Sequence, residues 1–377
     1  MSFDQIHQAF NNDNNVVKFQ SSFPKAIEYL LIRSIDKPQL IELLELNKQD
    51  VSFEKTPKIE ELYRRVFLLN LSKDTLSKFI LSKYPEIKAA RIVNESGLEA
   101  LLENFGNVRC GLRNDRLDTE VQKVVRNKRL RTWNELSTAF DTLAVKAREY
   151  AEWSYVNQAS TDLIEHFVND HKNVIPTLRK IPHIDFFYDF KEHGLIPFDL
   201  KITNISEEFF DQEERLAIKN SCQEILKACY KEIKKTEKAL PNLSTFDSTE
   251  DLFDFLNSLK TQFPEIEKVF DKILHTRKNT IQALHADRKK LEIWNYANQG
   301  PRLFCNNNRF FVFLAHESSL GDARGLKKKV KTIGSLINNH LNNLTFGSLN
   351  QFTYSYDLEA QLKGDYSTIS TSVLLSE

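Results

Sequence analysis

Residues 182–203 read PHIDFFYDFKEHGLIPFDLKIT, and this stretch decides the fold. Two runs within it, 184–190 and 196–202, are rich in aromatic and β-branched residues and carry polar residues at alternate positions, which is typical of strands. The four residues 191–194 lie between the runs and suit a turn. The sequence therefore predicts a β-hairpin.

Charged residues of this hairpin indicate a site. Residues two apart in a strand share a face, so Asp199 and Lys201 point to one side of the sheet. Asp185 begins the preceding strand and can meet them at one end of the hairpin. Asp189 shares the face of Asp185 but lies closer to the turn, and is the alternative to it. Charges in such an apolar strand are costly unless they are paired or bind a metal.

Two carboxylates and a lysine suit metal-assisted hydrolysis of a phosphodiester. Carboxylate oxygens are hard ligands that hold Mg²⁺, and a bound metal acidifies water and neutralises the phosphate. A lysine places a cation and a proton donor near the attacking water. The alternative for Asp199 and Lys201 is an ion pair on the surface of a strand.

The rest of the chain reads mainly as helix, with a second strand region near its end. Apolar positions recur at helical spacing over residues 1 to about 140. A long helix follows from Trp133 to His171, with a break expected near 158–161, and residues 206–298 are again helical. Beyond them the sequence predicts a strand over 309–315, a helix over 326–344, and weaker strands over 351–356 and 368–375.

This order of elements predicts a mixed α/β (α+β) fold with a sheet core flanked by helices. We expect an N-terminal helical region over 1–140, suited to DNA binding or dimerisation. The core is expected over 141–377, with residues 206–298 as a helical insertion.

The hairpin also resembles a known superfamily. Asp185, followed after 13 residues by Asp199-x-Lys201, looks like the PD-(D/E)xK nucleases in their Asp-x-Lys form. Residues 197–203 are similar to the third core strand of type II restriction endonucleases, and the likeness covers roughly 145–345. One departure is that His183 and Ile184 stand between Pro182 and Asp185, so the Pro-Asp pair is absent.

The resemblance implies a restriction-endonuclease-like core and a Mg²⁺-dependent, site-specific cut of double-stranded DNA that leaves 5′-phosphate ends. Asp185 and Asp199 would bind the metal, the Leu200 carbonyl would be a further ligand, and Lys201 would position the attacking water. Many such enzymes add an acidic residue from the helix before the hairpin. Glu165 is the best candidate, and Glu149 and Glu152 are weaker ones.

Basic residues outside the hairpin suit contact with DNA phosphates. The stretch Arg109–Arg131 has eight basic and three acidic residues, a net charge of +5, and a second cluster begins at Lys327. A solvated helix face is the alternative for both clusters. The residues expected to bind DNA are Arg126, Lys128, Arg129, Arg131, Lys327 and Lys328.

Composition limits the protein class. Among 377 residues, 52 Lys and Arg balance 52 Asp and Glu, so any nucleic-acid site must be a local basic patch. The four cysteines form no zinc pattern or disulfide framework, and no secretory signal or apolar span is visible, so we expect a cytoplasmic protein.

Cutting both strands needs two active sites, so a homodimer is expected, with a DNA methyltransferase as the partner in the system. The rival functions are a nuclease without sequence specificity, in defence or repair, and a DNA-binding protein of the same fold with an idle site.

Overall fold

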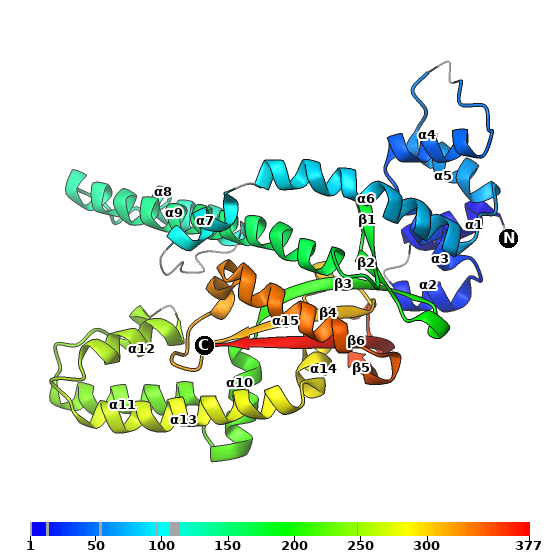
Figure 1. The fold of residues 1–377 in the computed structure, drawn as a ribbon. Coiled ribbons are helices and arrows are strands. Elements are labelled where there is room, and N and C mark those ends of the chain that lie inside the picture. The colour runs from blue at the N-terminus through cyan, green and yellow to red at the C-terminus, as the bar shows by residue number, and fades with distance from the viewer. Residues whose placement is uncertain (1, 13–14, 53–54, 96, 106–113, 247) are drawn as a thin grey trace.

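A computed structural model describes residues 2–12, 15–52, 55–95, 97–105, 114–246 and 248–377, and has a mixed α/β fold (Figure 1). The N-terminal region before the sheet is helical, as the sequence predicts. Its helices are α1 (Phe3–Asn12), α2 (Val16–Ser22), α3 (Ala26–Arg33), α4 (Lys37–Leu46), α5 (Ile59–Leu68), α6 (Lys73–Glu95), α7 (Leu98–Asn104), α8 (Asn114–Val125) and α9 (Trp133–Asn169).

A six-stranded mixed sheet follows, in the order β1-β2-β3-β4-β6-β5. Its strands are β1 (Val174–Ile181), β2 (Ile184–Asp189), β3 (Leu195–Asn204), β4 (Arg309–Ala315), β5 (Asn350–Tyr356) and β6 (Gly364–Ser376). β3 pairs with β4, and β4 with β6, in parallel; the other neighbours are antiparallel. The predicted hairpin, the strand over 309–315 and the two later strands are therefore confirmed. β1 was not predicted; it contains Pro176, which the sheet accepts because β1 is an edge strand.

The parallel pairing of β3 with β4 requires a long crossover, and the helical insertion supplies it. The insertion comprises α10 (Glu207–Ile218), α11 (Cys222–Thr236), α12 (Thr249–Ser258), α13 (Glu265–Ala286) and α14 (Lys289–Ala297). α15 (Val330–Asn343) lies between β4 and β5. Short 3₁₀ turns complete the chain: η1 (Lys191–His193), η2 (Leu243–Thr245), η3 (Pro301–Leu303), η4 (Ala323–Lys328) and η5 (Phe346–Ser348).

Two helix predictions are wrong in detail. The expected break near 158–161 does not occur, because the hydroxyls of Ser160 and Thr161 donate to the Asn157 carbonyl inside an unbroken α9. The helix expected from Leu326 begins at Val330, since the preceding residues form the tighter turn η4.

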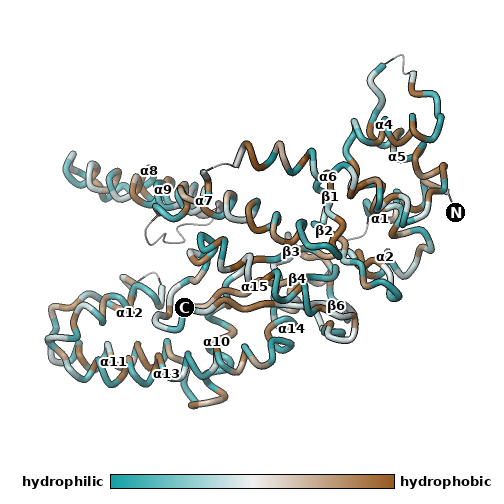
Figure 2. Tube along the Cα trace, viewed as in Figure 1, coloured by the Kyte–Doolittle hydropathy of each residue, from teal (hydrophilic) through white to brown (hydrophobic). Residues whose placement is uncertain are grey.

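The helices cover the two faces of the sheet unequally. α9 and α15 pack on one face, where Phe186, Phe198 and Phe310 join one apolar core. On the other face the N-terminal helices cover β1 and β2, while α10 and α14 cover β4 to β6. The central strand β4, every residue of which is buried, is accordingly largely brown in Figure 2. On this second face, two separate groups of helices pack on the sheet, and β3 lies between them.

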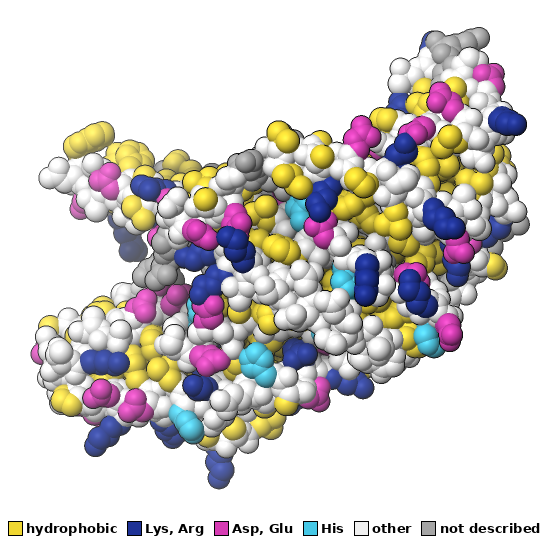
Figure 3. Space-filling view, viewed as in Figure 1, with side chains coloured by type: hydrophobic (Ala, Val, Ile, Leu, Met, Phe, Trp, Pro, Cys, Tyr) yellow, Lys and Arg dark blue, Asp and Glu magenta, His cyan; other side chains and the backbone are white. Residues whose placement is uncertain are grey.

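Two helical arms extend from the sheet to the same side, one made of α8 and α9 and the other of α11, α12 and α13 (Figure 1). The second arm has its own apolar core, which includes Leu226, Leu256 and Phe270. In the space-filling view the molecule is hollowed between the outer parts of the two arms (Figure 3). No described helix combines the length and the apolar character that crossing a membrane requires.

Candidate active site

The hairpin brings the predicted charged residues to one place. The register of β2 with β3 pairs Phe186 with Phe198, so Asp185 and Asp199 are the next residues on each strand. Since Phe198 and Ile202 point into the core under α9 and α15, Asp199 and Lys201 point to the opposite face. There they lie between the cover over β1–β2 and the cover over β4–β6.

Asp185 is held by the backbone of the neighbouring strand. Its Oδ2 accepts a 2.7 Å hydrogen bond from the Leu200 amide. Burial, followed by the negative charge of Asp199, raises the pKa of Asp185 to about 7. A cation bound beside this carboxyl would lower its pKa and favour the ionised form.

Asp199 forms an ion pair with a buried arginine across the parallel strands. The Nε of Arg309 donates to Oδ2 of Asp199 at 3.1 Å, and the two residues are register partners of β3 and β4. Arg309 also donates from Nη2 to Oε1 of Gln299 at 2.9 Å and lies over the ring of Tyr296. Arg309 was not predicted as a site residue; its only signal in the sequence is a charge at the start of an otherwise apolar strand.

Lys201 follows Asp199 on the same face of β3. Its side chain is exposed at the surface of the site, yet enough protein surrounds it that desolvation lowers its pKa. The positive charge of Arg309 lowers this pKa further, and Asp199 opposes both effects. The lysine is therefore available to water at the mouth of the site.

Glu165 of α9 approaches the site from the edge of the sheet. Its Oε1 lies 3.5 Å from Nζ of Lys180 in β1. Its negative charge contributes to the raised pKa of Asp185, after burial and the charge of Asp199. Burial raises the pKa of Glu165 itself. Of the two weaker candidates on α9, Glu152 pairs with the exposed Arg148, one helical turn away.

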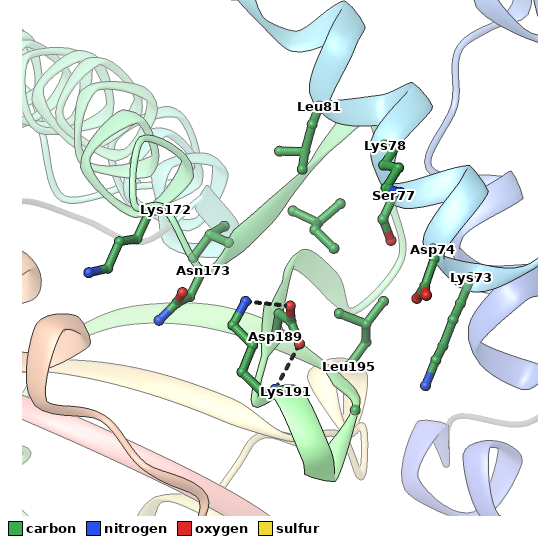
Figure 4. A pocket seen from close by; sticks show the side chains of 13 residues that line it. Lys73, Asp74, Ser77, Lys78, Leu81, Lys172, Asn173, Asp189, Lys191 and Leu195 are labelled. Carbon is green, nitrogen blue, oxygen red and sulfur yellow. Dashed lines mark hydrogen bonds and ion pairs between the residues drawn. The ribbon is translucent and has the colours of Figure 1, made fainter.

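Asp189, the alternative to Asp185, serves the hairpin turn. Its carboxylate accepts hydrogen bonds from both the amide and the Nζ of Lys191, at 2.8 Å each. It lines a pocket of about 320 Å³ with Lys73, Ser77 and Lys172, and Asp199 is not among the residues of this pocket (Figure 4). Four residues of strand, roughly 13 Å, separate it from Asp185.

Three further residues border the site and were not predicted to do so. His183, in the tight turn before β2, has a positive φ of 66°, and burial lowers its pKa. The side-chain amide of Asn307 donates to the His183 carbonyl, and that of Asn308 donates to the Pro197 carbonyl. These asparagines connect the segment before β4 to the hairpin, and their only signal in the sequence is a run of three asparagines, 306–308.

The donor set suits Mg²⁺ better than a metal that needs a closed protein cage. Among the described residues, no three His, Cys, Asp or Glu side chains gather as a metal site. Asp185 and Asp199 provide two carboxylates; burial first, and then the charge of Asp199, raises the pKa of Asp185, so a cation beside the pair would offset both effects. Mg²⁺ typically takes one or two carboxylates and completes its shell with water and substrate phosphate.

The basic residues predicted to bind DNA are placed differently from one another. Arg126, Lys128, Arg129 and Arg131 are all exposed at the turn between α8 and α9, at the tip of that arm. Arg109 and Arg113 of the same basic stretch lie outside the described residues.

In the second basic cluster the first lysine, Lys327, is turned inward. Lys327 is buried; its Nζ donates to the Asn157 side chain at 2.6 Å and lies over Trp153. Lys328 donates to the Phe105 carbonyl. Lys327 is therefore taken up by packing against α9, whereas Lys328 is half-buried.

The structure thus groups Asp185, Asp199 and Lys201, with Glu165 at the edge and Arg309 beneath. Asp189 and Lys327 lie elsewhere, in a turn and in a packed interior. No family model matches the chain, and no curated protein or solved structure matches it either.

Proposed function

We propose that the protein is a Mg²⁺-dependent DNA endonuclease of the type II restriction kind, which hydrolyses phosphodiester bonds and leaves 5′-phosphate ends. The observation that carries the proposal is the meeting of Asp185 on β2 with Asp199 and Lys201 on β3. The order of α9, antiparallel β1, β2 and β3, and parallel β4 also supports it, since this is the core that a PD-(D/E)xK resemblance implies.

Each residue would have a distinct task. Asp185 and Asp199 would hold the metal, with the Leu200 carbonyl as a further ligand. The bound metal would supply an acidified water and neutralise the charge on the phosphate. Lys201 would orient that water and offer a positive charge to the phosphate as negative charge develops on it.

Glu165 would support the site from the edge of the sheet. Its carboxylate pairs with Lys180, and its negative charge acts on Asp185. It would accept a hydrogen bond from a water at the site and add negative potential at Asp185.

The two arms offer a way to hold DNA. The exposed basic turn 126–131 at the tip of the α8–α9 arm suits phosphate contacts, which supply affinity without reading sequence. A homodimer would bring two sites to the two strands, and a DNA methyltransferase would protect the host sequence.

Digestion of unmethylated phage-type DNA, with and without Mg²⁺, tests the proposal directly. Wild type is compared with Lys201→Ala and with Lys191→Ala, a matched lysine in the turn of the same hairpin that pairs with Asp189 away from the site. Discrete bands that need Mg²⁺ and Lys201 are expected. A smear would replace the proposal with a nuclease without sequence specificity. Binding of a broad set of DNA fragments without any turnover would favour an idle site.

A further inference from the structure

Arg309 places a permanent positive charge under the site. Arginine stays protonated in proteins, so its charge does not depend on pH in the working range. The Asp199 carboxylate on one side and Gln299 on the other accept its hydrogen bonds, and the ring of Tyr296 lies 4.8 Å from the guanidinium. Its side chain is only 7% exposed. Held on these sides, the guanidinium cannot swing into solvent when another cation approaches.

The charges of the site therefore cancel before any metal is bound. With the carboxyls ionised, Asp185 and Asp199 contribute −2, and Lys201 and Arg309 contribute +2. Glu165 and its partner Lys180 at the edge add −1 and +1, so the sum stays zero. Lys201 and Arg309 flank the Asp199 side of the site, since Lys201 lies two residues along β3 from Asp199, the register partner of Arg309. Burial first, and then the positive charge of Arg309, lowers the pKa of Lys201.

A divalent cation entering this site alone meets a weaker net attraction than it would at two carboxylates without cationic neighbours. It adds two positive charges beside Arg309 and Lys201, whose repulsion offsets part of the attraction of the carboxylates. A DNA phosphodiester carries one negative charge, and placed against the same site it lowers that repulsion. The two ligands should therefore favour each other's binding.

We propose that Arg309 makes divalent-cation binding depend on the nucleic-acid phosphate, so that the site loads its metal together with DNA and poorly without it. This inference rests on the proposed nuclease function and concerns the regulation of the same site. Because coupling between two ligands is reciprocal, the metal should raise the affinity for DNA by the same factor.

Calcium titrations by calorimetry at pH 8 test the inference, since Ca²⁺ binds carboxylate sites and its heat is read without cleavage. Sheared unmethylated phage DNA is present or absent, and wild type is compared with Arg309→Gln and Arg309→Lys. Arg324→Gln is the control, because Arg324 pairs with Asp322 outside the site. Near-ultraviolet circular dichroism checks that each variant is folded.

Wild type is expected to bind Ca²⁺ at least about tenfold more tightly when DNA is present, within the usual range of coupling between sites. Arg309→Gln should bind Ca²⁺ about tenfold more tightly than wild type without DNA, and should gain less from adding DNA. Arg309→Lys keeps the charge and should resemble wild type, as should Arg324→Gln.

The outcomes that overturn the inference are distinct. Equal or weaker Ca²⁺ binding by folded Arg309→Gln overturns it, and so does equal Ca²⁺ binding by wild type with and without DNA, a result that needs no variant. If wild type cleaves DNA with Mg²⁺ in the digestion above, only the inference fails. If wild type binds no divalent cation even with DNA and does not cleave, the proposed function fails with it.

Discussion

The amide of Leu200 donates a hydrogen bond to the Asp185 carboxylate, so the backbone between Asp199 and Lys201 fixes the acid of the neighbouring strand. The regular pairing of β2 with β3 is present at Phe186 and Phe198. Just beyond this pair, the Leu200 amide of β3 donates to the side chain of Asp185 on β2. The geometry of the candidate site is therefore part of the sheet itself, and it forms whenever the hairpin does.

Asp185→Asn should stabilise the protein at alkaline pH. The carboxyl has a pKa of about 7 in the folded chain, against an ordinary value of 3.8. Between these values the unfolded chain releases the proton while the folded chain keeps it, so stability falls as pH rises and is lowest above pH 7. Asparagine does not ionise, so the variant should be more stable at pH 8 by on the order of 2 kcal/mol, after discounting for solvent.

Urea unfolding in chelator-treated buffer at pH 8 and pH 4 measures this difference. The advantage of Asp185→Asn should be small at pH 4, because this pH lies close to the ordinary pKa of 3.8 and the unfolded chain has gained little by releasing the proton. Asp189→Asn is the control, because that carboxylate belongs to the turn. An equal gain at both pH values would contradict the account.

Glu165→Gln should slow Mg²⁺-dependent cleavage by roughly ten- to a hundredfold, the range typical of groups that support metal ligands. The reason is that Glu165 and its partner Lys180 act on Asp185 from the edge of the sheet. Single-turnover rates at saturating DNA measure the effect. Glu152→Gln, on the same helix but paired outward with Arg148, should be unchanged. Equal rates for the two variants would remove Glu165 from the site.

Arg129→Gln should weaken DNA binding and its dependence on salt. Each lost phosphate contact lowers the slope of log K against log salt by about 0.9. Arg129 is exposed at the tip of the α8–α9 arm, whereas Lys327 is buried against Asn157. Fluorescence anisotropy over a range of salt should therefore show a shallower slope for Arg129→Gln and an unchanged slope for Lys327→Gln. An unchanged slope for Arg129→Gln with a shallower slope for Lys327→Gln would show that DNA contacts the region of Lys327 and not the tip of the α8–α9 arm.

Arg277→Met should destabilise the insertion strongly. Arg277 is buried and forms ion pairs with Glu214 at 2.8 Å and with Glu207 at 3.0 Å. Removing the cation leaves buried carboxylates unpaired, which costs about 3–5 kcal/mol. Thermal unfolding measures the loss. Arg215→Met removes a half-exposed pair with Glu224 and should cost under about 1 kcal/mol. Similar losses for both would show that burial of the Arg277 network is unimportant.

The hairpin could be predicted because alternation along a strand is a local signal. The face shared by Asp199 and Lys201, the strand over 309–315 and the helical insertion follow from patterns within a few residues. β1 escaped prediction because it mixes Pro176 with charged residues at its far end, and its place at the sheet edge is what permits both.

The missed parts of the site depend on contacts between distant segments. The ion pair of Asp199 with Arg309 joins residues 110 positions apart, and no local pattern encodes that register. The inward turn of Lys327 has the same origin, since its partner Asn157 is 170 positions away. A cluster of lysines looks the same in sequence whether it faces solvent or a helix.

The parallel placement of β4 also has a consequence for biosynthesis. β4 lies between β3, which the ribosome makes more than a hundred residues earlier, and β6, which is the last described strand in the chain. A nascent chain can form the hairpin early, but Asp199 gains its arginine only after the whole insertion has emerged. Until β6 follows, β4 has one open edge that is ready to pair with another chain. Translation that stalls between these strands would therefore produce an aggregation-prone chain.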